Sequence, residues 1–287
     1  MTEIAGRAAL VTGGGSGIGR ALCVALAAEG VSVVVADILS ERAESAAEEI
    51  TRTDGSALAV ACDVSDRASV RDAKAKAHAA VGAISLLFAN AGVTSVEPLT
   101  DLSADHFDWI TEVNLWGVSN CLQEFLPDMI ALRAGHVVAT ASVAGLIPSW
   151  LPYHVPYTAA KAGVIGMMLN LREELAEFGV GCTVLCPGGV ATRIHQTPRY
   201  RPARFGGPSE ERLKAAPRAF VQHTEKLHFR PPEEVAEMVL AAVRENRPMV
   251  VTDATRRELF VQKYVDVVLS AFDDAAAFDA RGSGKRS

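Results

Sequence analysis

The chain has 287 residues, of which 49% are hydrophobic, and carries a formal net charge of -6. This length suits one α/β domain and supplies enough apolar surface for a sizeable core. The basic residues are scattered apart from Arg199, Arg201 and Arg204, so nucleic acid is not expected as a main partner. The five cysteines form no CxxC pair and the seven histidines form no HExxH spacing, so we expect neither a metal site nor a disulfide framework.

The N-terminus leads directly into an apolar, strand-like run and lacks the cleavage site of a secretory signal. No apolar run reaches the length of about 18 residues that a membrane-spanning helix needs. We therefore expect a cytoplasmic protein without a membrane span.

Apolar runs alternate with helical patterns along most of the chain. In chain order, the first half predicts strand 8–12, helix 18–29, strand 31–36, helix 40–51, strand 57–61, helix 65–81 and strand 84–89. The second half predicts helix 103–132, strand 136–140, helix 155–178, strand 181–185, helix 232–245, strand 249–252 and helix 256–272. Pro127 is expected to bend or end part of the helix in which it lies. The apolar strands and intervening helices predict a Rossmann-type, doubly wound α/β fold, with a mostly parallel seven-stranded sheet and helices on both faces.

Residues 1–287 are interpreted as a single domain with two additions. Residues from about 188 to 229 are rich in glycine and proline and form an irregular insertion, in which we expect one or two short helices. This insertion follows the carboxyl end of a predicted strand, where ligands bind in such sheets, so it is expected to cover the substrate. Residues from about 254 to 287 form a helical extension, with 281–287 frayed.

A glycine-rich sequence, TGGGSGIG, lies between the first predicted strand and the first predicted helix. Glycine lets the backbone approach a pyrophosphate closely, and the N-terminus of the following helix faces the negative charge. A plain tight turn is the alternative, whereas a Walker A loop is excluded because no Gly-Lys-Ser/Thr follows. The residues expected to hold the pyrophosphate of a dinucleotide are Gly13, Gly15, Ser16, Gly17, Ile18 and Gly19.

Asp37 ends the second predicted strand, 18 residues after Gly19. A carboxylate there can accept hydrogen bonds from both hydroxyls of the adenosine ribose. It would repel a 2′-phosphate by roughly 3 kcal/mol at about 5 Å, so NAD is favoured over NADP. Arg20 and Arg42 are the nearby cations that could reverse this preference. A simple helix N-cap is the alternative role for Asp37.

Two further strand ends carry small or polar residues. Asp63 and Val64 could contact the adenine, although Asp63 could instead cap the next helix. Asn90, Ala91 and Gly92 follow the fourth strand and would pass beneath the cofactor.

Tyr157 and Lys161 are four residues apart in a predicted helix and therefore share a face. A lysine ammonium about 5 Å from the phenol would lower its pKa by a little over 2 units, which makes Tyr157 a candidate acid/base. Ser142, at the end of the fifth strand, could hold the substrate oxygen, or merely satisfy backbone groups there. Asn114 is a poor helix former inside a long helix; it could support a proton-relaying water or simply satisfy the core. Tyr153 lacks a lysine partner and is expected, with nearby residues, on the substrate side or in a loop.

These motifs, in this order and spacing, resemble the short-chain dehydrogenase/reductase family in its single-domain branch. The resemblance also includes PGGVAT, which follows the sixth predicted strand, and it covers roughly residues 5–250. It implies a catalytic tetrad of Asn114, Ser142, Tyr157 and Lys161, with Lys161 and Tyr157 also at the nicotinamide ribose. The residues that it implies on the nicotinamide side are Pro187, Gly188, Val190 and Thr192.

The chain departs from this family's pattern at two places: Ala89 replaces the first Asn of the usual NNAG, and no VDGG-like segment follows the last strand. A homodimer or homotetramer is nevertheless expected. The expected reaction is NAD-dependent hydride transfer between the cofactor and a secondary alcohol or ketone. An apolar substrate, such as a lipid, terpenoid or steroid-like alcohol, is suggested by a set of aromatic residues: Trp150, Phe205, Phe220 and Phe229.

Three alternatives remain open from the sequence alone. The first is a ketone reductase that uses NADPH, and the second is a regulatory protein that binds NAD without chemistry. The third is a methyltransferase, because an acidic residue after the second strand can also hold the ribose of S-adenosylmethionine. The paired Tyr157 and Lys161 would have no role in that last class.

Overall fold

The fold is taken from a computed structural model that describes residues 2–94, 96–208 and 229–283. Its centre is a seven-stranded sheet in the order β3-β2-β1-β4-β5-β6-β7, and every neighbouring pair is parallel. The predicted Rossmann-type sheet is therefore confirmed. The strands are β1 (Ala8–Thr12), β2 (Ser32–Asp37), β3 (Ala57–Ala61), β4 (Leu86–Ala89), β5 (Gly135–Thr140), β6 (Val180–Cys186) and β7 (Met249–Val251).

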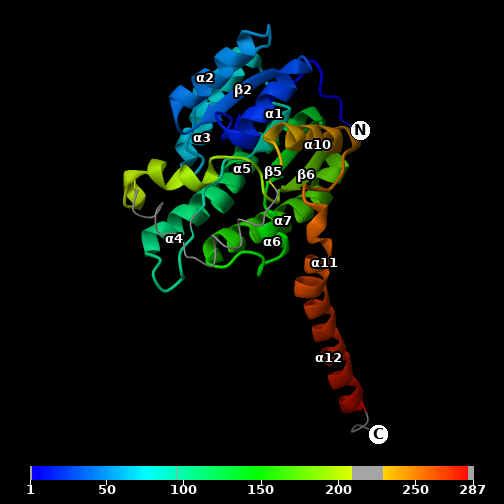
Figure 1. The fold of residues 1–287 in the computed structure, drawn as a ribbon. Helices are drawn as coiled ribbons and strands as arrows, with labels where there is room; N and C mark the ends of the chain where they lie inside the picture. The colour runs from blue at the N-terminus through cyan, green and yellow to red at the C-terminus, as the bar shows by residue number, and fades with distance from the viewer. Residues whose placement is uncertain (1, 95, 209–228, 284–287) are drawn as a thin grey trace.

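Helices cover both faces of the sheet (Figure 1). One apolar core lies between the sheet and the helices α1 (Gly17–Ala28), α2 (Ser40–Thr51) and α10 (Pro232–Glu245). A second core lies between the opposite face and the helices α3 (Arg67–Val81), α5 (Gly117–Leu132) and α7 (Val155–Leu175). The apolar strands are buried on both sides because each face of the sheet meets a helix layer.

The long helix expected over residues 103–132 is divided. It comprises α4 (Ala104–Thr111), a π-helical turn η1 (Glu112–Trp116) and α5. Pro127 lies inside α5 without ending it, so that part of the expectation is wrong. The irregular turn is instead the segment that contains Asn114, and π-helical turns of this kind often occur at functional sites.

The described part of the insertion after β6 contains two short 3₁₀ helices, η3 (Ile194–Tyr200) and η4 (Ala203–Phe205). A bridge between Val190 and Arg230 joins its two ends. Residues 209–228, which include Phe220, lie outside the described part of the chain.

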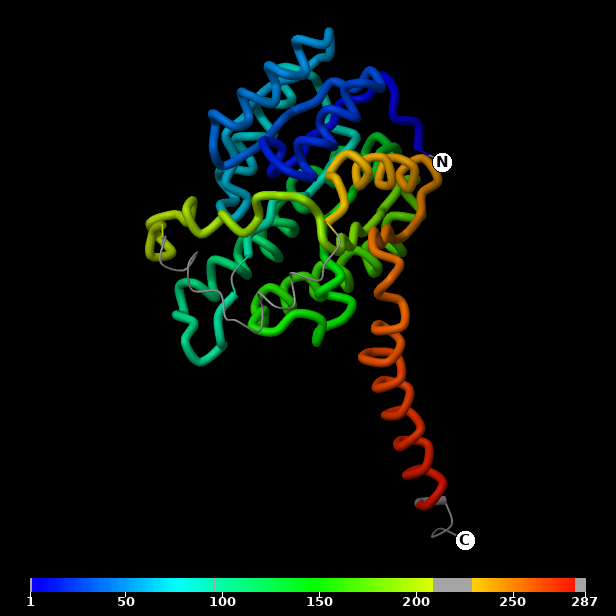
Figure 2. The backbone as a smooth tube through the Cα atoms, viewed as in Figure 1, coloured from blue at the N-terminus to red at the C-terminus, as the bar shows by residue number. Residues whose placement is uncertain are grey.

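The C-terminal extension is more helical than expected. After the short turn η5 (Ala254–Arg256), helix α11 (Arg257–Phe260) leads through a π-helical turn η6 (Val261–Val265) into α12 (Asp266–Ser283). The helix therefore continues past residue 272, and residues 281–283 are helical rather than frayed. Figure 1 and Figure 2 show it projecting away from the sheet and its covering helices. None of the helices in the described part of the chain has the length and apolar character needed to span a bilayer.

A buried histidine lies in the central sheet. The ring of His136, on β5, contacts the hydroxyls of Thr183 at 2.8 Å and Thr2 at 3.1 Å. Burial, with a smaller contribution from Arg172, lowers the pKa of His136 to about 3. The folded chain therefore keeps this ring neutral at pH values where the unfolded chain protonates it.

We predict that His136→Asn reduces the loss of stability on acidification. Between about pH 6.5 and pH 3 the unfolded state binds one proton more at this site, so stability is present above pH 6.5 and falls as pH falls. The histidine adds at most about 1.4 kcal/mol per pH unit to that slope. Urea unfolding at several pH values measures it, with the exposed His195→Asn as control. Equal slopes for wild type and His136→Asn would contradict the argument.

Candidate active site

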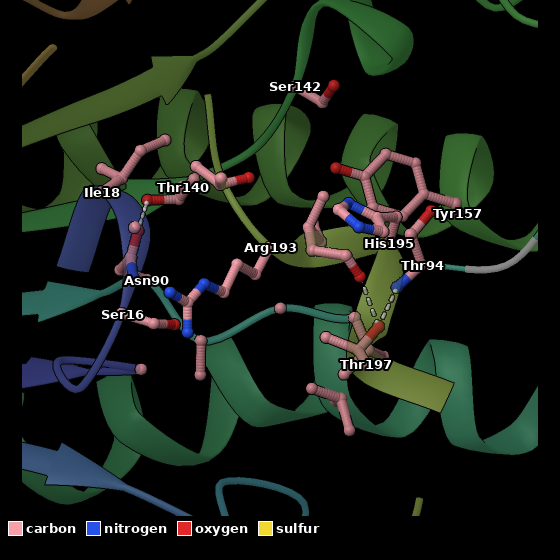
Figure 3. Close-up of a pocket in the computed structure, with 18 of the residues that line it drawn as sticks. Ser16, Ile18, Asn90, Thr94, Thr140, Ser142, Tyr157, Arg193, His195 and Thr197 are labelled. Carbon is pink, nitrogen blue, oxygen red and sulfur yellow. Dashed lines mark hydrogen bonds between the residues drawn. The ribbon is translucent and has the colours of Figure 1, made fainter. Parts of the chain in front are cut away.

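A cavity of about 540 Å³ opens at the carboxyl edge of the sheet. Its walls come from the segments that follow β1, β2, β3, β4, β5 and β6, together with α7 and the insertion. In Figure 3, Tyr157, Thr94 and His195 lie on one side of this cavity, and Ser16, Ile18 and Asn90 lie on the other. The parallel topology therefore brings together residues that are far apart in the sequence.

Most of the residues selected from the sequence line this cavity. Those that do are Gly13, Ser16, Gly17, Ile18, Asp37, Asp63, Val64, Asn90, Ala91, Gly92, Ser142, Tyr157, Lys161, Pro187, Gly188, Val190 and Thr192. Gly15, Gly19 and Asn114 are not among the lining residues. Each of these three instead supports a residue or loop that lines the cavity.

The glycine-rich loop connects β1 to α1 and has no room for side chains at several positions. A Cβ at Gly19 would lie 2.2 Å from the Gly13 carbonyl oxygen, and one at Gly15 would lie 2.9 Å from the Asp37 carboxylate. Gly13 and Gly17 also have φ angles of +64° and +50°, in the region that favours glycine. The backbone amides and the N-terminus of α1 therefore reach the cavity without side chains in the way.

The Asp37 carboxylate is held firmly at the end of β2. It accepts hydrogen bonds from the backbone N–H groups of Gly15 and Leu39, both at 3.1 Å. Burial raises its pKa, while these two bonds and the Arg42 charge act in the opposite direction. Helix α2 has Leu39 as its N-cap residue, so Asp37 is not a helix cap.

Asp63 has an ion-pair partner that the sequence did not reveal. Its Oδ1 accepts hydrogen bonds from the backbone N–H and hydroxyl of Ser65, and its Oδ2 lies 2.7 Å from the Arg204 guanidinium. Helix α3 is capped by Asp66 rather than by Asp63. Arg204 thus ties the insertion to the wall of the cavity.

Three side chains fix the backbone below the cavity. The Thr12 hydroxyl accepts hydrogen bonds from the N–H groups of Asn90 and Ala91, at 2.9 and 3.0 Å. The Thr140 hydroxyl donates to the Asn90 Oδ1 at 3.0 Å (Figure 3). These hydrogen bonds connect the ends of β1, β4 and β5 below the cavity.

Lys161 is buried, with 2% of its surface exposed. Its ammonium group donates a hydrogen bond of 2.7 Å to the Thr140 carbonyl and lies 5.7 Å from the centre of the Tyr157 ring. Burial lowers its pKa to about 7. The charge at this position therefore changes near neutral pH.

The pKa of Tyr157 is raised to about 12, because burial of the phenolate outweighs the opposing hydrogen bond with Ser142. From the sequence we expected Lys161 to lower the pKa of Tyr157 by a little over 2 units. This expectation is wrong, because the pKa of Tyr157 is raised instead. The reason is that the lysine is itself buried and directs its ammonium to a backbone carbonyl, while desolvation acts fully on the phenol.

Ser142 follows β5 and has both of the roles considered from the sequence. Its hydroxyl accepts a hydrogen bond of 3.1 Å from the Ala144 N–H and so caps the short helix α6 (Val143–Leu146). It also lines the cavity and acts to lower the pKa of the Tyr157 phenol, against the larger effect of burial. The cap holds the hydroxyl in place without taking it away from the cavity.

Asn114 is fully buried behind the cavity, with 0% of its surface exposed. Its Nδ2 donates to the carbonyls of Val93 and Ile110, and its Oδ1 accepts from the Val93 N–H at 3.2 Å. A Cβ placed at Gly92 would lie 3.0 Å from that Oδ1 and 3.5 Å from the Lys161 Nζ. The amide therefore fixes the loop after β4 and faces the lysine across Gly92.

The segment after β6 closes the cavity opposite the glycine-rich loop. The Gly188 N–H donates to the Thr252 hydroxyl at 3.0 Å, and a Cβ at Gly188 would lie 2.6 Å from that of Asp253. The Thr192 methyl lies 2.9 Å from the position of a Cβ on Gly17. This geometry leaves a narrow space between the two segments.

Comparison with known proteins identifies the family. The model of the short chain dehydrogenase family matches residues 7–201. The chain belongs to the short-chain dehydrogenase/reductase family. A C alpha-dehydrogenase from Sphingobium sp. is 32% identical over 292 residues, which cover 100% of this chain and 92% of the relative.

Comparison with solved structures identifies the same family. A short-chain dehydrogenase/reductase from Burkholderia phymatum in complex with NAD has a TM-score of 0.86 and 31% identity, with 94% of this chain and 97% of that chain covered. A putative short-chain dehydrogenase from Novosphingobium aromaticivorans has a TM-score of 0.77 and 25% identity, with 99% and 97% covered. The chain is thus an oxidoreductase of a family that binds nicotinamide cofactors, which removes the methyltransferase alternative.

Part of the cavity of this short-chain dehydrogenase is lined by aromatic side chains. Trp150 and His154 line the cavity, and the His154 ring meets the Tyr157 ring edge to face at 5.4 Å. Burial lowers the pKa of His154 to about 4, so the ring is neutral at physiological pH. Phe229 also lines the cavity, whereas Phe205 is buried in the core and is not among the lining residues, and Tyr153 lies in a loop outside the cavity.

Several contacts of this short-chain dehydrogenase, together with Tyr200, Thr94 and Thr197, were missed by the sequence reasoning. Arg42 donates a hydrogen bond of 2.6 Å to the Tyr200 hydroxyl, and its guanidinium lies 4.3 Å from the centre of the Tyr200 ring. The Thr94 N–H donates to the Thr197 hydroxyl at 3.2 Å (Figure 3). No local pattern marks these contacts, because each joins the insertion to a distant segment. Within the described residues, no group of three or more His, Cys, Asp or Glu could hold a metal ion.

We predict that Gly15→Ala weakens NAD binding by at least about tenfold. The added methyl would overlap Arg42 and press on the Asp37 carboxylate, and so displace the group that is expected to bind the ribose. Calorimetric titration with NAD measures the effect. Gly166→Ala is the matched control, since a Cβ there meets nothing within 4 Å. Unchanged affinity in Gly15→Ala would show that the position of Asp37 does not matter for binding.

Proposed function

We propose that this chain is an NAD-dependent oxidoreductase that transfers a hydride between nicotinamide and a secondary alcohol or ketone. One observation carries the proposal: Ser142, Tyr157 and Lys161 meet at the same cavity that the glycine-rich loop and Asp37 enter from the other side. A bound nicotinamide ring supplies or accepts the hydride. The chain's own residues then need only to bind, orient and move a proton.

The proton step belongs to Tyr157 in this proposal. The phenol is protonated at neutral pH, because burial holds its pKa at about 12, so it is ready to donate a proton to a carbonyl oxygen. Ser142 would hold that oxygen beside the phenol and stabilise its developing charge. In the opposite direction, the phenol must lose its proton, which requires positive charge nearby.

Two sources can supply that charge. Lys161 lies 5.7 Å from the Tyr157 ring, and its pKa of about 7 makes it partly protonated at neutral pH. The positive charge of an oxidised nicotinamide would add to it. Asn114 would act as a positioning residue, since its amide holds the loop that passes between it and the lysine.

The preference for NAD over NADP is supported by the neighbours of Asp37. A 2′-phosphate would meet the buried carboxylate, and both cations that could compensate are already engaged. Arg20 pairs with Glu49, and Arg42 is held by Tyr200. An NADPH-dependent ketone reductase is therefore the less favoured alternative.

The substrate is proposed to be an apolar secondary alcohol or its ketone. Trp150, Leu151 and Phe229 line the substrate end of the cavity. Among the described lining residues at that end, the acidic or basic side chains are Arg193 and two histidines. The Sphingobium relative is named for dehydrogenation at a Cα position, which supports a carbinol carbon as the reacting atom. The single domain, the cytoplasmic location and the homodimer or homotetramer remain predictions.

An NAD-reduction screen across secondary alcohols of different size and polarity tests this function. We expect NADH formation with apolar alcohols and little with small charged polyols. NADH formation with the polyols alone would reject the apolar substrate. Binding of NAD without turnover of any alcohol would favour the regulatory alternative.

We predict that Tyr157→Phe lowers turnover by about 10²–10⁴-fold, the usual contribution of a general acid or base, and leaves the affinity for NAD nearly unchanged. Lys161→Ala should lower both turnover and NAD affinity. Steady-state kinetics and calorimetry with the best alcohol of the screen measure the two effects. Tyr153→Phe, in a loop outside the cavity, is the control. Nearly full activity of Tyr157→Phe would exclude it as the acid/base.

We also predict that Tyr200→Ala improves NADP binding by at least about tenfold. Removing the ring and hydroxyl frees the Arg42 guanidinium, and one such charge near a phosphate is worth up to about 100-fold at 5 Å. Dissociation constants for NAD and NADP measure the change. Adding Arg42→Leu to Tyr200→Ala should abolish the gain. An unchanged NADP constant in Tyr200→Ala would show that Tyr200 does not restrain Arg42.

A further inference from the structure

The C-terminal helix, residues 257–283, leaves the rest of the molecule at the substrate end. Its first turn is anchored, because Leu259 and Phe260 pack against a small apolar cluster that includes Trp150. Beyond that turn it extends into solvent (Figure 1, Figure 2), and every side chain from Asp266 to Arg281 is exposed. A single helix of this length gains little stability from its own backbone bonds in water.

The exposed part is nevertheless strongly apolar. Seven of the seventeen large apolar side chains that are exposed among the described residues lie between Val261 and Phe278. Val267 is 62% exposed, Phe272 is 69% exposed and Phe278 is 72% exposed. Such a concentration of apolar surface marks an interaction site.

The apolar residues follow a helical spacing. Tyr264, Val268, Phe272 and Ala275 are four, four and three residues apart and form one stripe, which we call the helix seam. Ser270 and Asp273 lie on the opposite side of the same helix. This is the pattern of a helix that packs along its length against another helix.

The distribution of charge selects a second copy of the same helix as the partner. The root carries Arg257, Lys263 and Glu258 and is net positive, whereas the tip carries Asp273, Asp274, Asp279 and Arg281 and is net negative. An antiparallel pair brings the root cations of one copy to the tip carboxylates of the other, and it also opposes the helix dipoles. A parallel pair would bring the tip carboxylates together.

The residues are also arranged symmetrically about one position. Val268 lies midway between Lys263 and Asp273, and midway between Tyr264 and Phe272. A two-fold axis at Val268 would therefore bring each tyrosine near a phenylalanine of the other helix, whereas Lys263 and Asp273 lie off the seam. Self-complementarity of this kind is what a two-fold symmetric interface requires.

A membrane surface fits the helix poorly. Residues 257–281 carry three basic and five acidic side chains, whereas helices that lie on membranes are usually rich in lysine and arginine on the polar face. The region of the helix is included in alignments with the Sphingobium dehydrogenase and the Novosphingobium structure, which cover 100% and 99% of this chain.

We propose that the helix seam is a self-association surface, on which the C-terminal helices of two copies pair antiparallel with Val268 at the two-fold axis. The proposal does not depend on the reaction or the cofactor. In this proposal two protomers touch through residues of the C-terminal helix, which extends beyond the sheet and its covering helices.

The full-length chain tests it through its mass in solution, by light scattering or sedimentation over a range of concentrations. Val268→Glu combined with Phe272→Glu should reduce the mass of the assembly by a factor of two, because both side chains are exposed and their loss need not disturb the body. Ser270→Glu, which adds a glutamate on the opposite side of the helix, should leave the mass unchanged. An unaltered mass in the double variant, or a monomeric wild type, would overturn the proposal.

A cysteine at the two-fold axis tests the register. All five native cysteines are buried, so Val268→Cys would provide an exposed thiol. Mild oxidation should link two copies of Val268→Cys and should link Ser270→Cys at least about tenfold less. Equal linkage at both positions, or binding of the helix to phosphatidylcholine vesicles with no change of mass in the double variant, would contradict antiparallel pairing.

Discussion

The Lys161 ammonium donates a hydrogen bond of 2.7 Å to the Thr140 carbonyl, in a place almost shielded from water. This bond connects α7, which carries both Lys161 and Tyr157, to the end of β5. It holds a titratable cation at the end of β5, next to the helix that carries Tyr157. Burial acts on both groups in opposite directions, lowering the pKa of the lysine and raising that of the tyrosine. The site therefore favours the neutral forms of Lys161 and Tyr157. Any charge that enters the cavity changes the protonation equilibria of both side chains.

Much of this arrangement could be predicted from the sequence, because it depends on local patterns. Apolar runs separated by helices indicate a parallel sheet, and parallel strands place their carboxyl ends at one edge. Asp37 ends one such strand, and Asn90 and Ser142 follow two others, so their convergence on one cavity is a consequence of topology. The glycines between β1 and α1 were identifiable for the same reason.

The remaining features depend on contacts between distant segments. Arg42 and Tyr200 are 158 residues apart, and Arg204 and Asp63 are 141 residues apart. Sequence periodicity therefore predicts neither pair. The long helix is irregular at the π-helical turn that contains Asn114, whereas Pro127 lies inside α5 without ending it, so the proline did not locate this irregularity. The raised pKa of Tyr157 could not be foreseen either, since spacing gives the distance to a charge but not the loss of water around it.

The central claim is that burial holds the Tyr157 phenol protonated until positive charge enters the cavity. The most direct test is the ionisation of this one side chain, followed by NMR of ¹³C-labelled tyrosine in the wild type, with the Tyr157→Phe spectrum for assignment. The account predicts a pKa of about 12 for the protein alone and a value lower by about 2 units or more when NAD⁺ is bound. An identical phenolate fraction with and without NAD⁺ at every pH would contradict it.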